Sequence, residues 1–164
     1  MDEQASAPYR RDEPVARKLD RNWNELLQEI RVLQTGSQIL AAFLIVLPFQ
    51  SRFEELDRFQ TGWYLGLVAL ALLIVGLLLT PVAVHRHLFR RRVKDEMVRM
   101  ANLLLRASLM MLGLLLTGVA VFIVDFVLSR TAALITGLLL AWVMASLLIG
   151  VPLLVSRAAG RSAG

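Results

Sequence analysis

Residues Gly62–Val84 read GWYLGLVALALLIVGLLLTPVAV and contain no charged side chain. The run is longer than the roughly 20 apolar residues that a helix needs to cross the hydrocarbon core of a bilayer. Trp63 and Tyr64 open the run, and their amphipathic rings are typical anchors at a membrane surface. Pro81 lies near the far end, where it can kink a helix. The segment therefore predicts a transmembrane helix with its two aromatic residues at the interface.

The composition of the whole chain fits a lipid environment. Among its 164 residues, 57% are hydrophobic and 19% are charged, and the mean hydropathy is +0.61. Soluble domains average about 45–50% apolar and about 25% charged residues. The length allows a single domain. The chain has no cysteine, which excludes disulfide scaffolds, thiolate metal sites and cysteine nucleophiles.

Three other apolar segments fit the same pattern. A third span is expected at 103–128, and a short turn separates it from a fourth, uncharged span at 132–155. The first span is less regular, because its uninterrupted apolar part, Ile39–Phe49, is about half the length that a bilayer requires. We therefore expect the first span at about 30–49, with several polar residues in its cytoplasmic third.

The remaining segments are amphipathic or polar. Apolar residues recur at helical spacing over 15–33, which predicts an amphipathic cytosolic helix that continues into the first span. Residues 1–14 are expected to form a disordered cytosolic tail, and residues 85–100 a basic cytosolic loop or helix. The predicted fold class is all-α, a four-helix transmembrane bundle that makes up one membrane domain over 15–164.

The distribution of positive charge predicts the orientation. Of the 18 lysine and arginine residues, only Arg52, Arg58 and Arg130 fall in the two turns on one side of the membrane, and the others belong to the side of the termini. Cytoplasmic segments of membrane proteins carry the excess of positive charge. We therefore expect both termini in the cytoplasm, in a multi-pass protein of the plasma (inner) membrane.

The start of the first span carries a polar face. Arg31, Gln34, Thr35 and Gln38 follow the i, i+3, i+4, i+7 spacing of one side of a helix. Because polar groups are costly in hydrocarbon, this face is expected to turn into the bundle or into a water-filled vestibule. One hypothesis is a polar pocket on the cytoplasmic side, built from Arg31, Gln34, Gln38, Arg106 and Glu29. The alternative, which we favour, is that the arginines reach lipid phosphates while the glutamines join helices.

Asp125 is a carboxylate inside an apolar run. A lone intramembrane acid is a functional candidate. Its position near the outer end of the third span, however, favours a local ion pair with Arg130 or Arg58 over a proton relay.

Small residues recur at spacings that allow close helix packing in lipid. Those expected to pack helices are Gly62, Gly66, Gly113, Thr117, Gly137, Ala141 and Ala145. We favour packing within the bundle over a dimer interface, because the spans must first pack on each other.

The basic segment after the second span is expected to contact anionic lipid headgroups. The residues concerned are Arg86, Arg90, Arg91, Arg92 and Lys94. His85 and His87 point to different helix faces, so no metal site is expected. Positive charge beside apolar spans favours lipid over nucleic acid as the partner. The chain contains no familiar catalytic motif, so we expect neither enzyme activity nor a cofactor.

Three short sequences are distinctive: EIRVLQTG at 29–36, LPF at 47–49 and PVAVHR at 81–86. With their surroundings, from Asn22 to Val155, they make the chain resemble a domain-of-unknown-function family of small four-span bacterial membrane proteins. Members of that family are sometimes labelled sodium:proton antiporters. The resemblance implies a four-helix membrane fold, and it provides no catalytic residue.

These patterns lead to two functional hypotheses. We expect a non-enzymatic accessory, assembly or stress-response component of the membrane, whose partners are lipid and another membrane protein or further copies of the chain. The alternative is an oligomeric transporter or antiporter of small ions or solutes that uses the pocket of Gln34, Gln38 and Arg106. An antiporter needs a carboxylate near mid-membrane that alternates between a proton and a cation, and Asp125 is placed too close to one end for that role.

Overall fold

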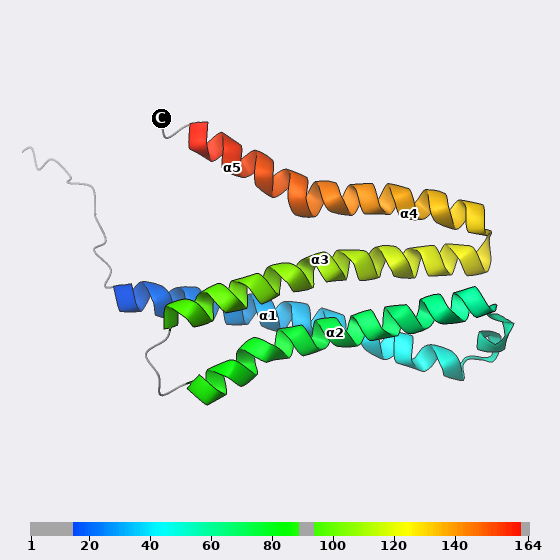
Figure 1. Cartoon of the computed structure of the whole chain (residues 1–164), viewed down its shortest axis with the longest axis horizontal. Coiled ribbons are helices and arrows are strands. Elements are labelled where there is room, and N and C mark those ends of the chain that lie inside the picture. Colours follow the sequence, from blue (N-terminus) through cyan, green and yellow to red (C-terminus); the bar gives the residue numbers. More distant parts are fainter. Residues whose placement is uncertain (1–14, 89–93, 162–164) are drawn as a thin grey trace, which may run out of the picture.

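The computed structural model describes residues 15–88 and 94–161, and every regular element in this part of the chain is helical (Figure 1). The elements are α1 Val15–Val46, η1 Leu47–Phe49, η2 Ser51–Glu55, α2 Arg58–Leu88, α3 Lys94–Val127, α4 Arg130–Ala145, η3 Ser146–Gly150 and α5 Val151–Arg161. Both η1 and η2 are 3₁₀ turns, whereas η3 is a π turn. The predicted tail, 1–14, lies outside the described residues, as do 89–93 in the middle of the predicted basic segment.

Four helical stretches are long and apolar enough to cross a membrane, as the sequence predicted. They are Trp23–Phe49, Arg58–Val84, Val98–Val127 and Arg130–Arg161. The helices alternate in direction, so the first and last described residues lie at the same end of the molecule (Figure 1). We name this the terminal end. The opposite end, which holds η1, η2 and the α3–α4 turn, is named the hairpin end. Four such stretches indicate a multi-pass membrane protein.

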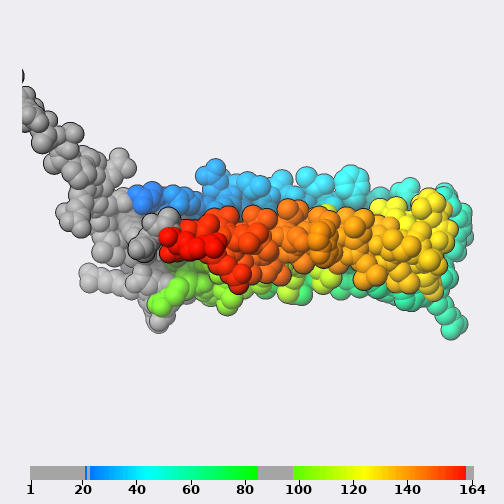
Figure 2. Space-filling view, turned by 90° about the horizontal axis from the view of Figure 1, so that it is seen from above, coloured from blue at the N-terminus to red at the C-terminus, as the bar shows by residue number. Residues whose placement is uncertain are grey.

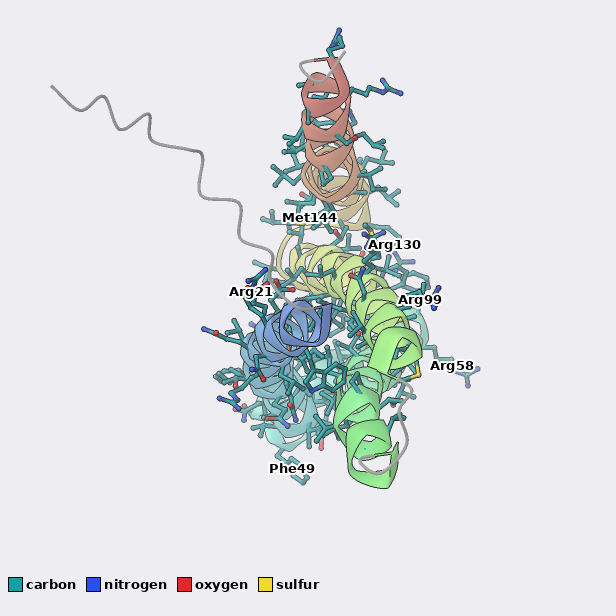
Figure 3. The ribbon with its side chains drawn as sticks, turned by 90° about the vertical axis from the view of Figure 1, so that its left-hand side faces the viewer. Arg21, Phe49, Arg58, Arg99, Arg130 and Met144 are labelled. Carbon is teal, nitrogen blue, oxygen red and sulfur yellow. The ribbon has the colours of Figure 1, made fainter. Side chains whose placement is uncertain are left out.

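The core is built by α1, α2 and α3. Their buried apolar side chains form one cluster: Ile30, Ala41, Leu44, Tyr64, Leu67, Ala71, Ile74, Leu78, Leu105, Leu115 and Phe122. The fourth helix packs chiefly on α3, and Figure 3 shows α3 between α4 and the α1–α2 pair. In Figure 2, α4 and α5 run as a ridge along one face. The molecule is therefore a three-helix core with a fourth helix attached to one side, which is more open than the predicted four-helix bundle.

The two aromatic residues that were predicted as interface anchors each donate a hydrogen bond to another helix. Tyr64 is only 4% exposed, and its hydroxyl donates a hydrogen bond to the carbonyl of Leu44 at 2.9 Å. Pro48 explains this bond, because proline has no N–H to give to the carbonyl four residues before it. The indole of Trp63 donates to the carbonyl of Gly118 in α3 at 3.0 Å. The anchor prediction is wrong for Tyr64, because the carbonyl of Leu44 satisfies its hydroxyl inside the core.

The predicted fourth span is interrupted by a π turn at Ser146–Gly150. Pro152 lies two residues after the turn ends, and it can neither donate to the carbonyl of Leu148 nor pack its ring against that carbonyl without a clash. A π turn widens the helix and relieves this conflict. Beyond it, α5 diverges from α3 (Figure 1), and all of its residues are exposed. The last turns of the fourth span thus leave the rest of the protein.

Glycines set how closely the helices approach. A Cβ atom at Gly113, Gly118 or Gly137 would lie 2.6–2.8 Å from a side chain of a neighbouring segment. The side chains concerned are those of Leu148, Leu67 and Val121 respectively. At Gly62 and Gly66 a Cβ atom would meet nothing within 4 Å. Gly113 and Gly137 thus lie where two segments of the chain come close, which is the place that the packing prediction gave them. Tyr64 and Leu67 turn a different face of α2 towards the core, so Gly62 and Gly66 face open space among the described residues, and their role in helix packing stays a prediction.

Valine substitutions at two glycines test this packing. We expect Gly118→Val to lower the free energy of unfolding by about 1–3 kcal/mol, because the added atoms overlap the buried side chain of Leu67. The matched change Gly66→Val should alter it by less than about 0.5 kcal/mol, because its Cβ faces open space. The measurement is unfolding in mixed micelles, followed by circular dichroism. Equal losses at the two positions would contradict the packing described here.

Candidate functional site

A polar cluster joins three helices at the hairpin end. The side chain of Asp125, at the end of α3, is 8% exposed, and its carboxylate accepts two hydrogen bonds. Gln60 in α2 donates from Nε2 at 2.8 Å, and Arg130 at the start of α4 donates from Nε at 3.3 Å. The acid therefore connects α2, α3 and α4 in a single contact.

The start of α2 prepares Gln60 for this role. The backbone N–H of Gln60 donates to Oδ1 of Asp57 at 2.7 Å, and the Oε1 atom of Gln60 accepts from the backbone N–H of Asp57 at 3.1 Å. This reciprocal pair is a capping box, which satisfies backbone donors that a helix start would otherwise leave free. With its oxygen engaged in the cap, the amide of Gln60 presents its nitrogen to Asp125.

Arg130 completes the cluster. Its guanidinium bonds Asp57 through Nη2 at 3.2 Å in addition to Asp125, and it lies over the ring of Phe59 at 4.3 Å. It therefore contacts two carboxylates and an aromatic face. Arg58, the other partner expected for Asp125, projects away from the helices (Figure 3). The sequence thus predicted the ion pair of Asp125 and Arg130, and it missed Asp57 and Gln60.

The geometry has a direct chemical consequence. A carboxylate that is held by an amide donor and a guanidinium is stabilised in its charged form. Such an acid is a poor choice for a group that must release a cation and take up a proton in turn. The cluster is suited to holding the ends of α2, α3 and α4 together. Among the residues whose side chains the structure describes, which leave out 15–20, 22 and 85–97, no group of three histidine or acidic side chains is placed to hold a metal ion.

The predicted polar stripe of α1 lies on its exposed side. Arg31, Thr35 and Gln38 are exposed and Gln34 is half-buried, whereas Ser37 is fully buried. This face does not pack into the core of the bundle, and the alternative, a water-filled vestibule, stays a prediction. Residues on the neighbouring face of α1, such as Ile30, Ala41 and Leu44, pack into the core. The hydroxyl of Thr35 is satisfied by the carbonyl of Arg31 at 3.0 Å, which explains how it tolerates this position.

The other members of the predicted pocket are not brought together by hydrogen bonds. Glu29 and Arg106 are exposed, and among the described residues no hydrogen bond or ion pair joins them to Gln34 or Gln38. The pocket itself stays a prediction. The predicted contacts with lipid headgroups also stay predictions: Arg90, Arg91 and Arg92 lie outside the described residues, as do the side chains of Arg86 and Lys94.

A shallow groove of about 200 Å³ runs between α3 and α4. Its lining includes the small residues Gly113, Thr117, Ala141 and Ala145. Ala141 and Ala145 are exposed, so their small side chains leave the groove open instead of filling an internal contact. The hydroxyl of Thr117 donates to the carbonyl of Gly113 at 2.9 Å and needs no other partner. The groove is therefore apolar and accessible from the side.

Residues 12–152 match the profile of a family described as "Family of unknown function (DUF6328)". The chain belongs to this family. The match covers most of the chain and confirms the resemblance to a family of unknown function. No curated protein and no solved structure matches the chain. Membership of DUF6328 therefore brings no activity with it, and the function of this chain has to be argued from its own residues.

A double-mutant cycle tests the polar cluster. We expect Asp125→Ala and Arg130→Gln each to destabilise the protein, and the double variant to lose less than the sum of the two, because both changes remove the contact between Asp125 and Arg130. The matched pair Arg52→Gln and Glu55→Gln should show additive, small effects, because both of those side chains are exposed. Unfolding in micelles measures all six variants. Additive losses for Asp125 and Arg130 would show that the cluster does not act as a unit.

Proposed function

We propose that the chain is a non-enzymatic assembly component of the plasma membrane that binds the transmembrane helix of another membrane protein along the α3–α4 groove. In this proposal both termini are cytoplasmic, as the segregation of positive charge favours. The hairpin end, with its cluster around Asp125, then lies on the outer side. The partner and the orientation are both parts of the proposal.

The observation that carries the proposal is the exposure of α4. It packs chiefly on α3, and large apolar side chains on its free surface, such as Leu138 and Trp142, are more than two thirds exposed. Exposed apolar side chains alone would only indicate lipid. The adjacent groove adds small residues at helix spacing, Ala141 and Ala145, which allow two backbones to approach closely. Close approach is what drives helix association where no hydrophobic effect operates between helices.

The cluster at the hairpin end supports the same role. It fixes the start of α4 against α2 and α3, through Arg130, while the π turn lets α5 diverge at the terminal end. The start of the fourth helix is therefore anchored, and this holds the free side of α4 in a fixed position facing the bilayer. A docking surface needs this combination of rigidity and access.

The alternative proposal, an oligomeric transporter that uses Gln34, Gln38 and Arg106, makes a different prediction. A transporter carries a measurable flux of ions or solutes when it is purified and placed in liposomes, and Arg106→Gln lowers that flux. An assembly component carries none. A flux through the wild-type protein that falls in Arg106→Gln would therefore support the transporter and contradict the assembly role.

Site-specific crosslinking in native membranes tests the assembly role. The chain has no cysteine, so Leu138→Cys can carry a maleimide–benzophenone label at an exposed position on α4. We expect one crosslinked product of defined mass. Adding Ala141→Leu should reduce its yield about fivefold, as expected for roughly 1 kcal/mol of lost packing. The matched change Ala69→Leu, at an exposed alanine of α2, should leave the yield unchanged.

A label at Phe43→Cys on α1 serves as the background for random contacts, because Phe43 is also strongly exposed. If Leu138→Cys gives no product beyond that background, or if Ala141→Leu has no effect on it, the α3–α4 groove is not a docking surface.

A further inference from the structure

A second groove, of about 330 Å³, lies at the hairpin end between α1 and α3. It exists because α1 stops at Val46 and the chain then leaves the helix axis through η1 and η2. This turn opens a wedge between the ends of the two helices. The groove is independent of the assembly surface proposed above, because the two share no lining residue.

The walls of the groove are hydrocarbon and aromatic rings. Its apolar lining is Leu40, Phe43, Leu44, Leu47, Phe53, Leu56, Val119, Phe122, Ile123 and Phe126. Phe53 packs edge-on against Tyr64 at 5.1 Å, which holds η2 against the core. Phe43 is 71% exposed and Ile123 is 52% exposed, so the groove opens sideways, towards the bilayer. An apolar groove that opens into lipid fits a hydrocarbon chain.

Charged and polar groups lie at one end of this groove. Arg52 and Gln50 are part of its lining, and the guanidinium of Arg52 lies over the ring of Phe126 at 4.7 Å. Arg52 also pairs with Glu55 at 3.0 Å. Both residues belong to η2, beyond the apolar stretches that end at Phe49 and Val127. A cation and an anion therefore stand side by side where the apolar groove meets the membrane surface.

We propose that this groove binds a phospholipid with an ethanolamine headgroup. One acyl chain lies between α1 and α3, the phosphate faces Arg52 and the ammonium faces Glu55. Guanidinium groups recognise phosphate through paired hydrogen bonds. A primary ammonium carries three N–H donors for a carboxylate, whereas the quaternary ammonium of a choline headgroup carries none. The neighbouring opposite charges fit a headgroup that itself carries both signs better than one with a net negative charge.

The test is competition among three lipids with identical acyl chains. The wild-type protein is placed in nanodiscs that contain equal amounts of ethanolamine, choline and glycerol phospholipids, and native mass spectrometry identifies the lipids that it retains on release. We expect the ethanolamine lipid to exceed the choline lipid about fivefold, the ratio that roughly 1 kcal/mol represents.

Variants at the polar end of the groove assign the roles of the two charges. Glu55→Gln should reduce retention of the ethanolamine lipid to that of the choline lipid, whereas Glu54→Gln, at an exposed glutamate next to it, should preserve the preference. Arg52→Gln should lower the retention of all three lipids, and Arg58→Gln, whose side chain is outside the groove lining, should not. Because these side chains are exposed, the changes leave the core intact.

A variant within the groove tests the position of the acyl chain. Val119→Phe fills the groove and should abolish retention of all three lipids, whereas Val82→Phe, on the exposed side of α2, should not. Thermal unfolding shows whether Val119→Phe is folded; if it is not, the pair Glu55→Gln and Glu54→Gln still decides the question.

Three results would overturn the proposal. Equal retention of the three lipids, unaffected by Glu55→Gln, would show ordinary annular lipid only. A preference for the glycerol lipid that survives Glu55→Gln would show a site for anionic headgroups. A dimer that Val119→Phe dissociates would show that another copy of the chain occupies the groove.

Discussion

Helices in a bilayer are held together by close packing and by hydrogen bonds, because hydrocarbon on the outside removes the hydrophobic drive that assembles soluble proteins. The structure follows this constraint throughout. Gly118 lets α2 and α3 approach, and the hydroxyl of Tyr64 satisfies the carbonyl of Leu44 that Pro48 leaves without a helical partner. At the hairpin end, where polar groups are tolerated, the carboxylate of Asp125 accepts hydrogen bonds from side chains of two other helices. The contacts of α1 with α2, of α2 with α3 and of α3 with α4 thus pair a polar group or place a glycine where a larger side chain would keep the backbones apart.

The same constraint explains the asymmetry of the molecule. The fourth helix is fixed at the hairpin end through Arg130 and is released at the terminal end, where Pro152 forces a π turn. Between these points it contacts chiefly α3, so the rest of its surface is left free by the other described helices. The two grooves arise from related departures from a regular bundle: one follows the small residues between α3 and α4, and the other follows the early end of α1. In both grooves the space between two helices is left unfilled by side chains of the chain itself.

Sequence reasoning identified the four apolar helices and the pairing of Asp125 with Arg130, because length, charge and local spacing determine both. It failed where a choice depended on which helix face turns inwards. The polar stripe around Arg31 and Gln38 was expected to face the bundle or a water-filled vestibule; it does not enter the core, because Ile30, Ala41 and Leu44 on the neighbouring face of α1 pack there. The motif of Gly62 and Gly66 suggested close packing, but nothing on the sequence alone shows that the neighbouring helix contacts Leu67 instead. Gln60 could have been found, since Asp57-x-x-Gln60 has the spacing of a capping box.

The most direct test introduces single cysteines into this chain, which has none of its own, and measures on which side of the membrane each one can be labelled. Cells that express Ser51→Cys, Ser129→Cys, Arg157→Cys or Leu73→Cys are treated with a membrane-impermeant maleimide, before and after permeabilisation. Four spans with both termini inside predict labelling of the two hairpin-end positions on intact cells, labelling of Arg157→Cys only after permeabilisation, and none of Leu73→Cys. Labelling of Ser51→Cys and Ser129→Cys from opposite sides, or ready labelling of Leu73→Cys, would contradict four helices that cross a bilayer.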